Sequence, residues 1–254
     1  MLGLLIVLLP TCTPVEGLQV IIVSRMVVGT AVDGKWSNPS DKPPAISYPA
    51  TFHLVGLGKE QGTKRISSIQ YFEETGGLLF AEIEGDVPGE MTDSALALRP
   101  PAYPRAVQAL SNDSAIYMAA VKNYLATKGL RGVEIKLNKV LRVDLDGNGT
   151  QEVLIEASNT EMLGTNQPKV DYWGVMLRFI DAKGKVQMVN YGLTIDRGEW
   201  RMRSWHKIAG VADLDGDGMY EVIIASGYYE GDSAEVRRFE TTTTRILCGW
   251  GAGA

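Results

Sequence analysis

Two short acidic segments in the C-terminal half place oxygen-bearing side chains at the same positions. The first starts at Asp144 and the second at Asp213, and the two align without gaps. Each carries Asp or Asn at positions 1, 3 and 5, Gly at position 6 and Glu at position 9. A calcium ion takes six to eight hard oxygen ligands, and alternate residues of a tight loop can turn inward where glycine permits a positive φ. We therefore interpret both segments as Ca²⁺-binding loops.

The assigned ligands are the oxygens at positions 1, 3, 5, 7 and 9, with position 7 contributing its backbone carbonyl. Carboxylates this close together repel one another unless a cation or bulk water compensates their charge. The first loop has three carboxylates and the second has four, and because ligand charge tunes affinity we predict tighter binding in the second loop. The assigned residues are Asp144, Asp146, Asn148, Thr150 and Glu152 in the first loop, and Asp213, Asp215, Asp217, Met219 and Glu221 in the second.

The alternative interpretation is that both segments are acidic hairpin turns without a metal, because Asp-Gly favours a turn by itself. The repeated spacing, the shared glycine and the apolar strand on each side favour the metal. The sequence argues against an EF-hand pair, because an EF-hand places a bidentate Glu at position 12 and continues into a helix. Here position 12 is Ile155 or Ile224, within a run of residues that favours a strand.

The pattern D-x-[DN]-G-[DN]-G-x-x-E followed by an aliphatic strand resembles the FG-GAP/VCBS repeats of integrin-type propellers and of many exported bacterial proteins. The similar region covers about residues 137–250. This resemblance implies a propeller-like blade whose hairpin loop holds Ca²⁺ through positions 1, 3, 5, 7 and 9. Two features depart from the family pattern. Position 9 is Glu rather than the more usual Asp, and two repeats are present where a closed propeller has at least four blades.

Each acidic loop lies between two strand-like segments, and two more such segments follow it. We expect each copy to form four consecutive antiparallel strands, as in a propeller blade. Residues 133–254 would then contain two calcium-binding repeats, at 137–204 and 205–250. The expected strands are 133–143, 152–157, 172–180 and 185–193 in the first copy, and 205–212, 221–226, 234–240 and 244–250 in the second.

The preceding residues 18–105 predict a β-rich region that ends in a proline-containing linker. Residues 85–105 carry four prolines and indicate a linker without regular structure. Within residues 106–132, an apolar stripe from Ile116 to Leu125 predicts an amphipathic helix over about 113–128 that packs on a sheet. The predicted fold is therefore mainly β, with one helix and two blade-like four-stranded units. The strand-like segments of the N-terminal region are 19–28, 51–57, 66–72 and 78–83.

Residues 1–17 predict an export signal. Their apolar run, residues 2–9, has the length of a signal core and is too short to span a bilayer. We therefore expect a protein that is secreted, periplasmic or on the cell surface, with no transmembrane span. Cys12 leaves open a third possibility, a lipid-anchored adhesion module.

The composition narrows the classes of function. A formal charge of −5 and a pI near 5.2 do not indicate a nucleic-acid-binding surface. Two cysteines exclude a disulfide framework and a cysteine-rich zinc site, and two histidines leave little for His-based catalysis. We expect a non-enzymatic protein with two Ca²⁺ sites and a surface that binds an unidentified protein or glycan. The alternative is an exported hydrolase with its chemistry in residues 18–130, although that region holds one histidine, His53, and no cysteine.

Overall fold

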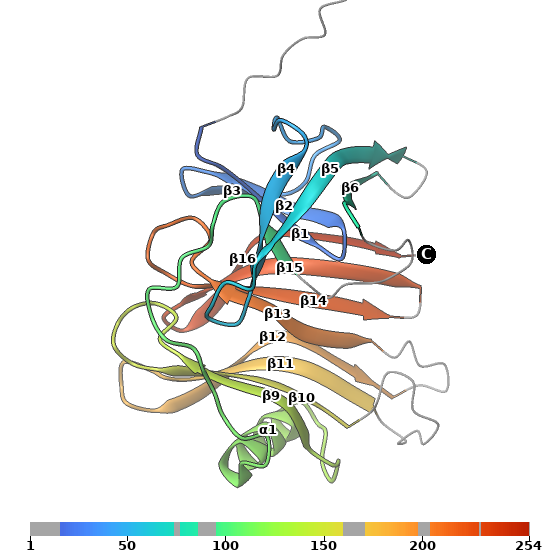
Figure 1. The fold of residues 1–254 in the computed structure, drawn as a ribbon. Coiled ribbons are helices and arrows are strands. Elements are labelled where there is room, and N and C mark those ends of the chain that lie inside the picture. The colour runs from blue at the N-terminus through green and yellow to red at the C-terminus, as the bar shows by residue number, and fades with distance from the viewer. Residues whose placement is uncertain are drawn as a thin grey trace, which may run out of the picture.

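The computed structural model describes residues 16–73, 77–85, 95–159, 171–197, 204–228 and 230–253. Within these ranges the chain is mainly β with one α-helix, which confirms the predicted fold class. The elements stack in four layers: a β-barrel at the top of Figure 1, two antiparallel sheets below it, and the helix α1 at the bottom. The first fifteen residues of the predicted export signal lie outside the described ranges.

The N-terminal region forms a closed six-stranded barrel. Its strands pair in the order β1-β7-β4-β5-β6-β2, and the β1–β2 hairpin closes the ring, while β3 pairs with β2 outside it. All six residues of β1 are buried, because one face of this strand points into the barrel and the other packs on the neighbouring sheet. The strands are β1 (Leu18–Val23), β2 (Met26–Val32), β3 (Lys35–Ser37), β4 (Ala50–Val55), β5 (Thr63–Phe72), β6 (Leu78–Ile83) and β7 (Ala95–Ala97).

Two details of the barrel differ from the sequence-based expectation. The segment 19–28, predicted as one strand, is a hairpin that turns at Ser24 and Arg25, whose φ angles are 48° and 71°. Such turns usually carry Gly or Asn, so the residue types gave no signal of this one. The predicted linker 85–105 contains β7, which fills the space between β1 and β4. A three-residue strand is too short to show a periodicity of its own.

The C-terminal half forms two antiparallel sheets, each with four consecutive strands in meander order. We call them sheet 1 (β9–β12, with β8 at its edge) and sheet 2 (β13–β16). Both acidic loops connect the first two strands of their sheet. The bounds are β8 (Gln108–Ala109), β9 (Lys136–Val143), β10 (Glu152–Ser158), β11 (Asp171–Ile180), β12 (Val186–Asp196), β13 (Trp205–Ala212), β14 (Glu221–Tyr228), β15 (Gly231–Glu240) and β16 (Thr243–Gly253).

Sheet 2 lies at the centre of the stack and is buried on both faces. In β14, Val222 and Ile224 pack toward sheet 1, while Ile223 and Ala225 pack toward the barrel. This alternation follows from the two-residue period of a strand, and burial on both faces explains the continuous apolar run.

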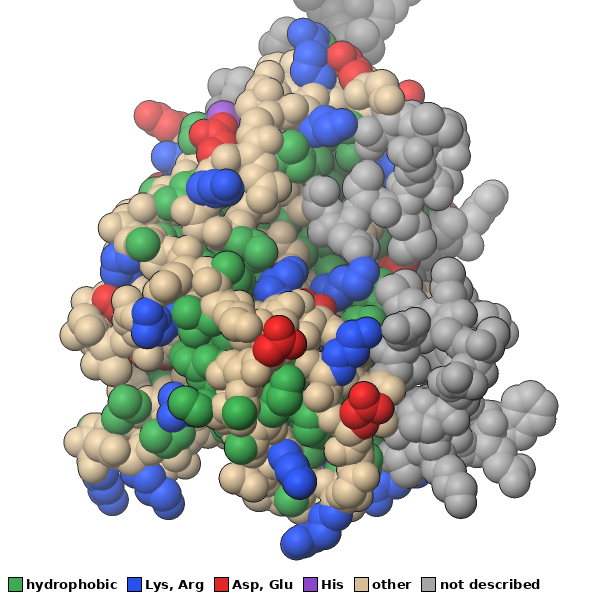
Figure 2. Space-filling view, turned by 60° about the horizontal axis from the view of Figure 1, so that its bottom comes forward, with side chains coloured by type: hydrophobic (Ala, Val, Ile, Leu, Met, Phe, Trp, Pro, Cys, Tyr) green, Lys and Arg blue, Asp and Glu red, His purple; other side chains and the backbone are tan. Residues whose placement is uncertain are grey.

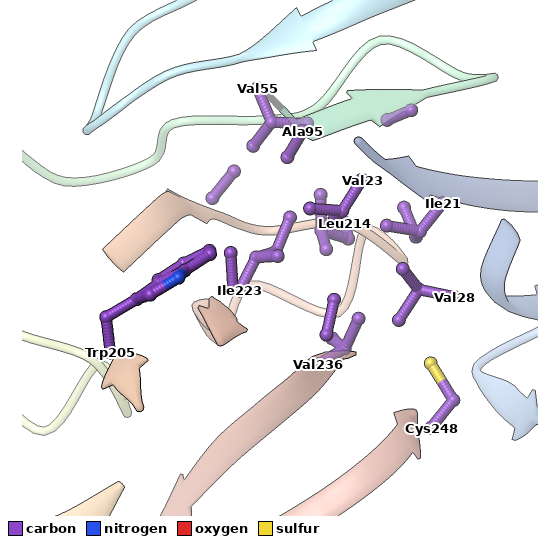
Figure 3. Packing of buried hydrophobic residues seen from close by; sticks show 14 of the residues in the cluster. Ile21, Val23, Val28, Val55, Ala95, Trp205, Leu214, Ile223, Val236 and Cys248 are labelled. Carbon is purple, nitrogen blue, oxygen red and sulfur yellow. The ribbon is translucent and has the colours of Figure 1, made fainter. Parts of the chain in front are cut away.

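The barrel side of this core is visible in Figure 3, where Val23, Val28 and Val55 of the barrel face Ile223 and Val236 of sheet 2. The free thiol of Cys248 lies in the same core and is 1% exposed, as expected for a small buried apolar residue. The barrel thus covers the face of sheet 2 that points away from sheet 1.

Helix α1 (Ala115–Thr127) covers the opposite face of sheet 1. Val121 and Leu125 are fully buried against the sheet, which confirms the predicted packing of the helix. Ile116 is 70% exposed, so the predicted apolar stripe does not pack along its whole length, although Tyr117 and Met118 are partly buried against the same cluster. The two-sheet stack is therefore closed by the helix at one end and by the barrel at the other.

Among the described residues, no helix has the length and apolarity needed to cross a bilayer. Figure 2 shows the α1 end of the molecule, where Lys and Arg side chains, some of them adjacent, lie among acidic, polar and apolar ones. The described part of this face therefore mixes basic side chains with the other types.

Candidate metal centre

Glycine shapes both acidic loops. Gly147 and Gly149 in the first loop, and Gly216 and Gly218 in the second, have φ between +74° and +86°, a conformation that other residues rarely adopt. The strand that leaves each loop pairs with the strand that enters it. This pairing returns the Glu at position 9 to the side of the Asp at position 1.

In the first loop, the ligand atoms of Asp144, Asp146 and Glu152 lie within 4.8 Å of one another. Glu152 is 1% exposed, and its Oε2 accepts the backbone N–H of Leu145 at 2.8 Å. Asp144 Oδ2 accepts the N–H of Gly149 at 3.1 Å, whereas Asp144 Oδ1 is buried and has no hydrogen-bond donor among the described residues. Because such an oxygen costs free energy when it is left unpaired, it marks where a cation would be most stabilising.

The cluster changes the proton affinity of its most buried member. Burial raises the pKa of Glu152 to about 7; the carboxylates of Asp146 and Asp144 add to this shift, and the N–H of Leu145 opposes it. Without a compensating cation, the folded chain therefore resists ionisation of Glu152.

In the second loop, the ligand atoms of Asp213, Asp215 and Glu221 form a cluster of the same size. The surroundings differ, because the Arg238 side chain of β15 reaches into this cluster. Its Nε donates to Glu221 Oε1 at 2.8 Å, its Nη2 to Asp215 Oδ2 at 2.9 Å, and its Nη1 to Asp217 Oδ2 at 2.7 Å.

Arg238 and Glu221 form a buried ion pair. Burial opposes the positive charge of Arg238, but the carboxylates of Glu221, Asp215 and Asp217 raise its pKa above the ordinary value. Burial also raises the pKa of Glu221, an effect that Arg238 opposes. The oxygens of Glu221 accept hydrogen bonds from Leu214 N and from Arg238 Nε and Nη2, which is the bonding of an ionised carboxylate. We therefore describe the pair as charged.

The two loops contact each other through Tyr220 and Arg105. The N–H of Tyr220 donates to the carbonyl of Leu145 at 2.8 Å, and its hydroxyl accepts the N–H of Arg105 at 3.1 Å and donates to the carbonyl of the same residue. The Arg105 side chain donates to the carbonyls of Asp144 and Leu145 at 2.6 and 3.2 Å. The first loop is thus attached to sheet 2.

The barrel holds the second loop in the same manner. Gln19 Nε2 donates to the carbonyl of Leu214 at 2.8 Å, and Trp36 Nε1 donates to Asp215 Oδ2 at 2.8 Å. Each acidic loop therefore lies where one layer of the stack meets the next.

The structure brings together the predicted ligands at positions 1, 3 and 9 of both loops. Asn148 and Asp217 at position 5 also order the loop, because their Oδ1 atoms accept the N–H of Thr150 at 2.6 Å and of Met219 at 2.8 Å. The sequence-based assignment of the site did not include Arg238, whose place opposite Glu221 is visible only once the strand register is known.

Arg105 and Trp36 were likewise not identified from the sequence, because both lie far from the loops along the chain and carry no motif. No family model, curated protein or solved structure matches this chain. The resemblance to FG-GAP/VCBS repeats thus stays a prediction.

Proposed function

We propose that this protein binds Ca²⁺ in its first acidic loop and that the ion stabilises the corner where sheet 1 meets sheet 2. The observation that carries this proposal is the buried Oδ1 of Asp144, which has no donor within the described part of the chain and lies in a cluster of three carboxylates. A cation at this point would remove both the unpaired oxygen and the repulsion within the cluster.

The chemistry of the donors favours calcium. The clustered side chains are all carboxylates, which suit hard cations better than the softer ions that prefer His or Cys. Asp144, Asp146 and Glu152 would hold the ion, and the side-chain oxygen of Asn148 and the carbonyl of Thr150 supply further oxygens of the same kind. A set of up to five ligands of mixed type suits Ca²⁺ better than Mg²⁺, which demands near-ideal octahedral geometry and keeps several waters.

A bound ion would supply positive charge and would take part in no reaction. The chain orients the ligands: the Leu145 N–H fixes Glu152, the Gly149 N–H fixes Asp144, and Arg105 holds the carbonyl of Asp144. Because Tyr220 and Arg105 bind the same loop from sheet 2, an ordered first loop also fixes the position of one sheet on the other.

We further propose an exported, non-enzymatic protein whose calcium-stabilised sheets present a surface for a protein or glycan partner, as the resemblance to FG-GAP/VCBS repeats implies. The net charge of −5 and the mixture of basic with acidic, polar and apolar side chains on the face in Figure 2 favour such partners over nucleic acid.

Equilibrium dialysis against radioactive Ca²⁺, with the wild type and an Asp144→Asn variant, tests the calcium proposal. The substitution keeps the shape of the side chain and removes one ligand charge, so we expect much weaker binding. Glu134→Gln removes the same charge from an exposed residue outside the loops and should bind like the wild type. Unchanged binding by Asp144→Asn, or no binding to the wild type at millimolar calcium, would refute the proposal.

A further inference from the structure

The two sheets differ at one position that faces their acidic loops. In sheet 2, Glu221 on β14 pairs with Arg238 on β15. In sheet 1, Val153 pairs with Arg178, so the residue opposite Glu152 is Phe179 when the register is continued by one. Sheet 2 therefore places a guanidinium beside its loop where sheet 1 places an aromatic ring.

Phe179 cannot compensate the charge of the first loop. It is 2% exposed and packs on Phe239, with ring centroids 5.1 Å apart. The guanidinium of Arg105 does contact this loop: it hydrogen-bonds to the backbone carbonyls of Asp144 and Leu145, and its Nε lies 3.8 Å from Asp144 Oδ2. Among the described residues, Asp144 Oδ1 therefore still has no hydrogen-bond donor.

In the second loop, by contrast, no buried carboxylate oxygen lacks a hydrogen-bond donor among the described residues. Both oxygens of Asp213 accept backbone N–H groups, from Gly216 at 2.7 Å and from Gly218 at 2.9 Å. Arg238 hydrogen-bonds to Asp215, Asp217 and Glu221, as described above, and its side chain is 11% exposed.

Trp36 adds a further donor to Asp215 Oδ2. A calcium ion in this loop would have to break several of these bonds. It would also leave the charge of Arg238 buried without its partners, which is strongly unfavourable.

We infer that Arg238 is an internal cation that replaces calcium in the second loop, so that the protein binds one Ca²⁺ per chain, in the first loop. The inference rests on the proposed function for the first loop. It reverses the order of affinity that loop charge alone predicts, because Arg238 contributes a positive charge from outside the motif. It also implies that replacing Arg238 by a neutral residue converts the second loop into a calcium site.

The test counts bound ions in the folded full-length protein by equilibrium dialysis with Ca²⁺. We expect one ion for the wild type, none for Asp144→Asn, one for Asp213→Asn and two for Arg238→Met. Arg245→Met is the charge-matched control, because Arg245 is 59% exposed and pairs with Glu240 at 3.2 Å on the surface. It should bind one ion, like the wild type.

The outcomes distinguish a failure of the inference about Arg238 from a failure of the calcium proposal for the first loop. Two ions on the wild type, one of them lost in Asp213→Asn, would overturn the internal-cation inference and leave the proposed function intact. A folded Arg238→Met variant that gains no ion would also overturn the inference. No ion on the wild type would refute the proposed function, and the gain or absence of an ion in Arg238→Met would then still decide the role of Arg238. If Arg238→Met does not fold, the comparison of Asp144→Asn with Asp213→Asn decides the inference alone.

Discussion

Calcium should stabilise the folded protein, and its effect should increase with pH. The perturbation is the addition of Ca²⁺ to protein that has been dialysed free of metal. By the proposal the ion would bind the folded loop, whereas the unfolded chain does not gather Asp144, Asp146 and Glu152 in one place. Binding to the folded state alone raises the free energy of unfolding by mass action.

The expected size follows from the oxygen ligand set and from the affinity of extracellular calcium modules. With a dissociation constant of about 10⁻⁴–10⁻³ M, about 10 mM Ca²⁺ adds roughly 1.4–2.7 kcal/mol to the free energy of unfolding. For a chain of this length, this corresponds to a rise in Tm of about 3–11 °C.

The pH dependence follows from Glu152. Its pKa is about 7 in the metal-free folded protein and near the ordinary 4.5 in the unfolded chain. Between these values the unfolded chain binds fewer protons than the folded one, so the metal-free protein loses stability as pH rises, by up to about 3 kcal/mol from this group. Calcium holds Glu152 ionised and removes this loss, and at lower pH it must displace a proton. The increase in Tm on adding calcium should therefore be larger at about pH 8 than at about pH 5.5.

Thermal unfolding followed by circular dichroism measures this effect. Calcium is added to metal-free protein rather than removed with a chelator, because the calcium affinity of chelators itself changes with pH. Asp144→Asn should lose the increase in Tm at both pH values, and Glu134→Gln should keep it. The reasoning would be refuted by an equal or larger increase at the lower pH, or by a wild-type Tm that calcium leaves unchanged.

Three further predictions concern buried groups outside the acidic loops. Lys139→Met removes the ammonium group 3.7 Å from the buried carboxyl of Glu156 and should lower the free energy of unfolding in urea by about 3 kcal/mol; an unchanged value would contradict the pairing. Burial lowers the pKa of His206 to about 4. The free energy of unfolding should therefore fall by up to about 3 kcal/mol as the pH drops from about 6.5 to 4. His206→Gln should flatten that part of a curve of stability against pH. A Cβ at position 29 would lie 2.3 Å from Cys248 Sγ, so Gly29→Ala should cost about 1–3 kcal/mol, measurable as a lower Tm; an unchanged Tm would show that the barrel and β16 move apart at no cost.

The local pattern of the C-terminal half is strong enough to be read from the sequence. The ligand spacing, the loop glycines and the flanking apolar runs predict two hairpins with clustered carboxylates, and the structure places the carboxylates of positions 1, 3 and 9 together. These features are local, because a hairpin fixes its own loop through residues that are neighbours in the chain.

The barrel is less visible in the sequence. Its closing strand β7 has three residues, and the turn at Ser24 and Arg25 uses residue types that favour no turn. The strand β7 pairs with β1 and β4, which lie far away in the sequence, so its pairing energy is not recorded in the local pattern.

The sequence by itself determined the mainly β class, the four-stranded units and the acidic loops, because all of these follow from short-range periodicity and spacing. The tertiary structure decided which loop has an arginine among its carboxylates. Arg238 joins the second loop only through the register of β14 and β15, and Trp36 and Gln19 reach it only because the barrel packs on sheet 2. The charge of a loop follows from its motif. The electrostatic potential at the loop also depends on every charged group that the fold brings beside it.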